Sequence, residues 1–191
     1  MWCSFFINKN FNYESYPFDW IWSNIDFVIN TFERDYFEFT ECEKLNPVWN
    51  PPHKHTYIFN NNCNGDNNRI CSAVSVHDAD KQSKSKYISN IPLINEKYIR
   101  RFKRLYDLLN TNENNIFIRK VLPAPQGAVK KDFDTYDKIN YLSKLLLQKF
   151  KANIIICIID HEGSLINKNN SNNIKIFNSF NSLLIYIKTV F

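Results

Sequence analysis

The chain has 191 residues, of which 44% are hydrophobic and 16% aromatic, and it carries a formal net charge of +5. This composition excludes a disordered chain and is typical of a single domain, residues 1–191, that buries a substantial core. Five cysteines, an odd number, and an amino terminus without a basic leader favour a reducing, cytoplasmic compartment over secretion. No apolar run approaches the about 20 residues that cross a bilayer, so no membrane partner is expected.

The first informative segment, residues 15–23, concentrates aromatic side chains around one proline. Pro17 fixes its own φ and biases Tyr16 towards an extended conformation, so the segment is predicted to be a rigid turn. Its aromatic side chains are expected to anchor the turn in the core: Tyr16, Phe18, Trp20 and Trp22. A buried Asp19 needs a partner because an unpaired carboxylate is costly to bury. It either caps a backbone amide or holds a functional group.

A helix is predicted directly after this turn, over residues 23–36. Ser23 and Asp26 resemble a capping box, with Asp in place of the usual Glu. Apolar residues then recur at helical spacing as far as Tyr36. A loop is predicted for residues 41–56 because three prolines interrupt that stretch.

The rest of the chain alternates strands and helices. Strands are expected at residues 57–59, 73–76, 116–121, 154–159 and 174–177, and the run at 154–159 is apolar enough to be buried on both faces. Helices are expected at residues 92–109, from Asp132 or Asp134 to Phe150, and at 183–187. This order favours an α/β fold, a single-domain three-layer sandwich whose largely parallel sheet is flanked by helices.

A family resemblance rests on Pro17-Phe18-Asp19-Trp20 and the serine that follows at position 23. These residues resemble a family of uncharacterised proteins described as papain-like cysteine peptidases, with members in bacteria and large DNA viruses. The other matching positions are Cys3, His77-Asp78, Arg100-Arg101-Phe102 and Phe117-Ile118-Arg119. The resemblance spans about residues 3–121 and leaves a C-terminal α/β part, residues 132–191. A viral source would imply the cytoplasm of the host.

The resemblance implies a cysteine hydrolase or peptidase. Cys3 would be the nucleophile and His77 the base, with Asp78 or Asp19 orienting the imidazole. Such a thiol needs a lowered pKa, which a neighbouring imidazolium can supply. The sequence departs from the family pattern in two places: the strand and Ser-Leu-Gly expected before Cys3 are missing, and Ala79 replaces a Phe. A truncated and inactive relative is therefore an alternative.

Polar residues follow three of the expected strands. Three predicted strands end in ionisable residues: His77-Asp78, Arg119 and Asp160-His161. In open α/β sheets ligands bind beyond the carboxyl ends of parallel strands, so these residues are expected to share one site. Trp20, Arg119, Asp160 and His161 are the expected substrate-binding residues. The alternative is that these polar residues only mark exposed loops.

Two functions of other classes stay open. The chain could be a non-catalytic α/β binding module, or a transferase that acts on a phosphorylated sugar or nucleotide through Asp160, His161 and Arg119. The chain has only three glycines, and their positions exclude a Walker loop or a dinucleotide fingerprint. No cofactor is expected, and the substrate and oligomeric state are not indicated.

Two further patterns have simpler explanations. A zinc set of His53, His55, Cys63 and Cys71 has no standard ligand spacing, so no metal is predicted. The helix at 92–109 places basic residues opposite its apolar face: Lys97, Arg100, Arg101, Lys103 and Arg104. That basic face is expected to be solvated, and because no nucleic-acid motif accompanies it, a nucleic-acid partner is not expected.

Overall fold

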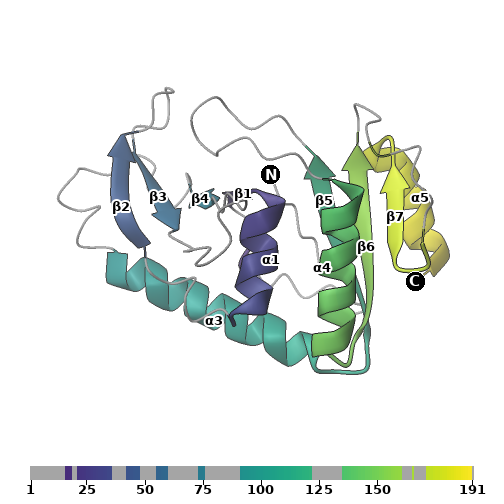
Figure 1. The fold of residues 1–191 in the computed structure, drawn as a ribbon, viewed down its shortest axis with the longest axis horizontal. Coiled ribbons are helices and arrows are strands. Elements are labelled where there is room, and N and C mark those ends of the chain that lie inside the picture. The colour runs from purple at the N-terminus through teal and green to yellow at the C-terminus, as the bar shows by residue number, and fades with distance from the viewer. Residues whose placement is uncertain are drawn as a thin grey trace.

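The computed structural model describes residues 16–18, 21–35, 42–47, 55–59, 73–75, 91–121, 135–160, 165 and 171–190. Its elements in chain order are β1 (Trp22–Ser23), α1 (Ile25–Glu33), β2 (Cys42–Pro47), β3 (His55–Phe59), β4 (Ala73–Ser75), α3 (Ile91–Leu109), β5 (Asn114–Val121), α4 (Tyr136–Lys149), β6 (Asn153–Asp160), β7 (Ile174–Phe177) and α5 (Phe180–Val190). The strands form a four-stranded sheet, β1-β4-β3-β2, and a three-stranded sheet, β5-β6-β7 (Figure 1). The fold is α/β, as the sequence predicted.

The three-stranded sheet is parallel throughout and is buried on both faces. On β6, Ile156 and Ile158 belong to the core shared with α1, α3 and α4. Cys157 and Ile159 point to the opposite face, where they pack with Leu183 of α5. Helices therefore cover both faces of the parallel sheet, which gives three layers (Figure 1). The prediction that the apolar run at 154–159 is a strand buried on both faces is confirmed.

The four-stranded sheet is antiparallel. The predicted strand at 57–59 lies in it as part of β3, and residues 73–75 of the predicted strand at 73–76 form β4, whereas Val76 lies outside the described residues. The predicted loop at 41–56 is wrong for Cys42–Pro47, which forms β2, and for the first residues of β3. Pro47 is compatible with a strand here because β2 is at the edge of the described sheet, where a missing N–H need not remove a ladder bond.

Phe32 of α1 connects five parts of the core. Its ring centroid lies 6.1 Å from that of Phe18 in the aromatic turn and 6.2 Å from that of Tyr106 in α3. It lies 6.3 Å from Phe117 of β5 and 6.0 Å from Phe150 at the end of α4, both edge to face. Edge-to-face and offset rings at these separations attract each other beyond the area they bury. Phe18 is fully buried, as predicted for the turn.

The ends of α1 differ from the prediction. Asn24 is the N-cap in place of Ser23, and its side-chain oxygen accepts a hydrogen bond from the Phe27 backbone N–H at 2.9 Å. Asn24 accepts from the backbone N–H three residues after it, which is the bond expected of an N-cap residue. The cap and its bond are therefore the predicted kind, shifted by one residue along the chain. The helix ends at Glu33 rather than 36, and Asp35 follows with a φ of 59°, a left-handed conformation that stops helix propagation.

Two lysines of α4 hold α1 near both of its ends. Lys138, in the first turn of α4, forms an ion pair with Asp26 in the first turn of α1. Lys149, in the last turn of α4, donates a hydrogen bond to the Phe32 carbonyl oxygen at 2.7 Å and forms an ion pair with Asp35. The two helices therefore run in the same direction on one face of the parallel sheet (Figure 1).

The other helices start or face differently from the prediction in three respects. α4 is capped by the Thr135 hydroxyl rather than by Asp132 or Asp134. α5 begins at Phe180, three residues earlier than expected, because Ser179 caps its first turn. In α3, Ile99 was predicted on the buried face but is 37% exposed, and Arg101 of the predicted basic face is only 7% exposed.

We expect Phe32→Ala to lower the free energy of unfolding by about 4 kcal/mol, because it removes a buried ring and leaves a cavity between five elements. Urea unfolding followed by circular dichroism measures this change. Phe180→Ala is the control, since Phe180 is 45% exposed and should change stability by less than about 0.5 kcal/mol. Equal effects of the two substitutions would contradict the central role of Phe32.

Candidate functional site at the junction of the two sheets

Arg119 connects the two sheets where their edge strands meet. Its Nη1 donates a hydrogen bond to the backbone oxygen of Ser23 at 3.4 Å, so β5 is linked to β1. The Arg119 side chain is 6% exposed. The sequence predicted a strand over residues 116–121 with Arg119 near its end, and β5 does end at Val121, two residues after Arg119. Arg119 is therefore a buried link between β5 and the start of α1.

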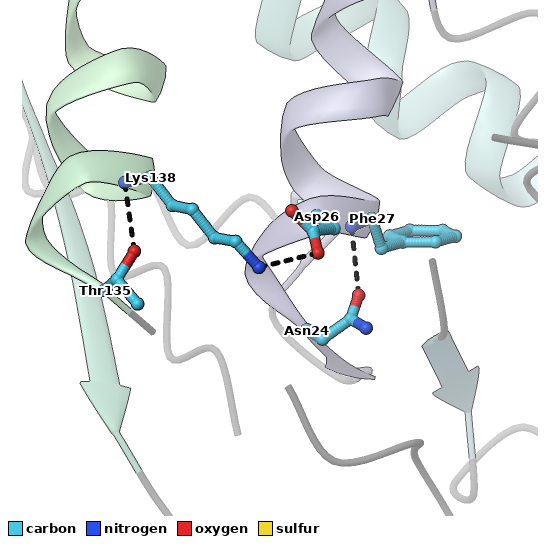
Figure 2. A network of polar contacts seen from close by, with 5 residues as sticks. All are labelled: Asn24, Asp26, Phe27, Thr135 and Lys138. Atoms are coloured by element: carbon cyan, nitrogen blue, oxygen red, sulfur yellow. Dashed lines mark hydrogen bonds and ion pairs between the residues drawn. The ribbon is translucent and has the colours of Figure 1, made fainter. Parts of the chain in front are cut away.

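Two helices begin beside this link. Figure 2 shows Lys138 of α4 reaching Asp26 of α1, with an Nζ–Oδ2 distance of 2.8 Å. The same view shows the two capping residues, Asn24 on α1 and Thr135 on α4. The amino terminus of a helix carries a partial positive charge, so this corner of the molecule favours anionic groups. α4 follows β5 along the chain, which places both helix starts at the carboxyl edge of the parallel sheet.

Asp160 ends β6 at the same edge. It is fully buried, and its Oδ2 accepts a hydrogen bond from the Leu165 backbone N–H at 2.6 Å. Leu165 is itself buried in the main core. Because side chains alternate along a strand, Asp160 shares the face of Ile158, and Arg119 shares the face of Phe117. Both ionisable side chains therefore lie on the face that α1 and α4 cover.

The expected meeting of three strand ends in one parallel sheet is wrong for β4. β4 pairs antiparallel with β1 and β3 and belongs to the other sheet. Hydrogen bonding with strands distant in sequence decided this placement, and the pattern of residues within 73–76 did not reveal it. The carboxyl ends of β5 and β6 do lie together, since Val121 is in register with Asp160.

Most of the predicted site residues lie outside the described residues. These are Cys3, Asp19, Trp20, His77, Asp78 and His161. His53, Cys63 and Cys71 of the considered zinc set lie outside them as well, and His55 is described only through its backbone in β3. Within the described ranges, no three His, Cys, Asp or Glu side chains gather as a metal site would require.

Cys157 is excluded as a nucleophile by its surroundings. Its side chain is fully buried within β6. Burial raises the pKa of its thiol to about 12, although the nearby positive charge of Lys175 acts in the opposite direction. A thiol that stays protonated at neutral pH is a poor nucleophile.

Comparison with protein families matches residues 2–158, which is 157 of the 191 residues, to the family described as "Putative papain-like cysteine peptidase (DUF1796)". The chain belongs to this family. The matched range includes Cys3, His77 and Arg119, and it ends before Asp160 and His161. No curated protein and no solved structure matches the chain. Among the helices that the structure describes, none combines the length and apolarity needed to cross a membrane.

We expect Lys138→Met to lower the free energy of unfolding by about 3 kcal/mol. Asp26 is only 2% exposed, so removing its partner leaves a buried carboxylate without its counter-charge. Chemical unfolding of Lys138→Met, Asp26→Asn and the double variant measures the coupling. The double variant should lose less than the sum of the two single changes. Lys144→Met, a control at an exposed position on the same helix, should change the free energy of unfolding little. If the effects of Lys138→Met and Asp26→Asn add to within about 0.5 kcal/mol in the double variant, the pairing is contradicted.

Stability should depend on Cys157 at alkaline pH. Burial raises the pKa of the Cys157 thiol from 9.0 to about 12, so the unfolded chain loses this proton at a lower pH than the native protein. The Cys157 contribution to stability is therefore present below pH 9 and is lost as the pH rises from about 9 to about 12. The melting temperature of wild-type protein should fall relative to Cys157→Ala between pH 8 and 11. If the melting temperatures of wild type and Cys157→Ala change in parallel over this pH range, the expectation is contradicted.

Proposed function

We propose that the protein is a cysteine hydrolase of the papain type, with Cys3 as nucleophile and His77 as general base. Asp19 or Asp78 would orient the imidazole of His77. The observation that carries the proposal is the family match, whose range covers all of these residues. A free catalytic thiol suits a reducing, cytoplasmic compartment.

The proposed reaction is acyl transfer to sulfur. The Cys3 thiol gives its proton to His77, and the sulfur attacks the carbonyl carbon of the scissile bond. The tetrahedral intermediate collapses, the bond to the leaving amine breaks, and the His77 imidazolium protonates that amine. Water, deprotonated by His77, then hydrolyses the thioester and restores the thiol.

Strand register supports Asp19 as the group that orients His77. β1 and β4 are antiparallel, with Trp22 opposite Val74 and Ser23 opposite Ala73. The start of β1 therefore lies beside the end of β4. Asp19 precedes Trp22 by three residues and His77 follows Ser75 by two, so each is within about 11 Å of a described strand end along the chain. Both residues are therefore close along the chain to the paired ends of β1 and β4, which supports Asp19 as the partner of His77.

The proposal also assigns four residues to substrate binding: Trp20, Arg119, Asp160 and His161. Trp20 adjoins Asp19 in the chain, and His161 adjoins Asp160. Arg119 and Asp160 lie on one face of the parallel sheet, near the carboxyl ends of β5 and β6. The contact of Arg119 with the Ser23 oxygen indicates that Arg119 contributes by positioning β1.

Alkylation of the native protein by iodoacetamide at pH 7 tests the nucleophile. Cys3 should react at least about ten times faster than Cys42 or Cys63, because a neighbouring imidazolium favours its thiolate. Cys157 should stay unlabelled until the protein unfolds. Peptide mass spectrometry measures the rate at each position. Cys3 reacting no faster than Cys42 and Cys63 would overturn the proposal and leave a binding module with this fold.

Histidine variants separate activation of Cys3 from simple exposure. His77→Ala should slow Cys3 alkylation by about tenfold or more, whereas His53→Ala, the matched control, should not change it. Asp19→Asn should slow Cys3 alkylation less than His77→Ala does, and it should leave the fold intact. Hydrolysis of a fluorogenic peptide library, lost in Cys3→Ala, then identifies the acyl group that is cleaved. Equal alkylation rates in His77→Ala and His53→Ala would exclude His77 as the base.

A further inference from the structure

Arg101 of α3 is a buried cation whose hydrogen bonding is incomplete. Its side chain is 7% exposed, and no acceptor among the described residues reaches its buried Nη1. The guanidinium lies over the ring of Tyr98, with its Cζ 5.3 Å from the ring centroid. Its neighbour in the chain, Arg100, is exposed. Arg101 is thus the one cation of the predicted basic face that the fold turns inwards.

The contact with Tyr98 does not offset the burial of this charge. Arginine stays protonated at any physiological pH, so it cannot avoid the penalty by losing its proton. Burying an ion without a counter-charge costs several kcal/mol, whereas a cation–π contact contributes about 0.5–2 kcal/mol. A negative charge close to Nη1 would remove most of this deficit.

A second cation approaches the same ring. Lys97 Nζ lies 5.9 Å from the centroid of Tyr98, which is fully buried. α3 as a whole carries five basic and two acidic side chains, a net charge of +3. An anion beside this ring would interact favourably with both cations. The two cations and the positive potential of the helix therefore favour an anion beside Tyr98.

We propose that Arg101 and Lys97 bind a small oxyanion, a carboxylate or phosphate group, beside the ring of Tyr98. The planar guanidinium suits two oxygens of one such group, and the lysine ammonium adds a compact charge. This site uses neither Cys3 nor His77, so it stands or falls separately from the proposed hydrolase.

Thermal unfolding of the full chain in phosphate, acetate and chloride at equal ionic strength tests the site. At ten times the dissociation constant, phosphate or acetate should raise the melting temperature of the wild type by about 3 °C over chloride. The larger of the two shifts tells whether the site prefers phosphate or carboxylate. No shift beyond that in chloride would overturn the proposal.

Variants at neighbouring arginines locate the bound anion. Arg101→Met should abolish the shift and should be at least as stable as wild type in chloride, since it removes a buried uncompensated charge. Arg100→Met, which removes an exposed charge one residue away, should keep the shift. Arg101→Lys keeps the charge without the fork and should weaken phosphate binding about tenfold by calorimetry, which provides a second measure if Arg101→Met folds poorly. Equal melting-temperature shifts in Arg101→Met and Arg100→Met would overturn the proposal and indicate diffuse binding of the anion to the surface.

Discussion

The packing of Phe32 is the interaction on which the rest of the structure depends. Its ring contacts the aromatic turn, α3, β5 and the end of α4, so it fixes the position of α1 against all of them. Edge-to-face contacts restrict orientation as well as distance. Because α1 starts directly after β1, the placement of this one helix also sets where the antiparallel sheet lies relative to the parallel sheet.

Polar contacts complete what the aromatic packing begins. Lys138 and Lys149 hold α1 near its two ends, and Arg119 holds the carbonyl of Ser23 just before it. The segment from β1 to the end of α1 is thus held by contacts to α4 and β5. A papain-type mechanism needs such rigidity, since the nucleophile and the base must meet within hydrogen-bond reach.

The sequence predicted those features that depend on local periodicity. The apolar spacing of α3 and the continuous apolar run of β6 gave their positions and, for β6, burial on both faces. Features that depend on pairing between distant segments were not predictable. The antiparallel partners of β4 lie in β1 and β3, which are distant from it along the chain. The cap of α1 moved by one residue because Asn24 and Ser23 are chemically equivalent choices at that position.

For the candidate site, the sequence predicted Arg119 and Asp160 near the ends of neighbouring parallel strands, which β5 and β6 are, but it missed the Ser23 link and the Lys138–Asp26 pair. Neither could be deduced from spacing, since each joins residues about a hundred positions apart. Cys3 and His77 depend on the family match, because no periodic pattern marks a nucleophile or a base.

The range shared with the family ends inside β6, whereas the fold continues through β7 and α5. α5 buries Leu183 and Ile187 against Ile116, Ile118 and Cys157 on the second face of the parallel sheet. A fragment cut at residue 158 would lose this cover and expose a sheet of branched apolar side chains to water. The range that the family model matches is therefore shorter than the part of the chain that covers the sheet, and we expect a recombinant fragment to need α5 in order to keep these side chains buried.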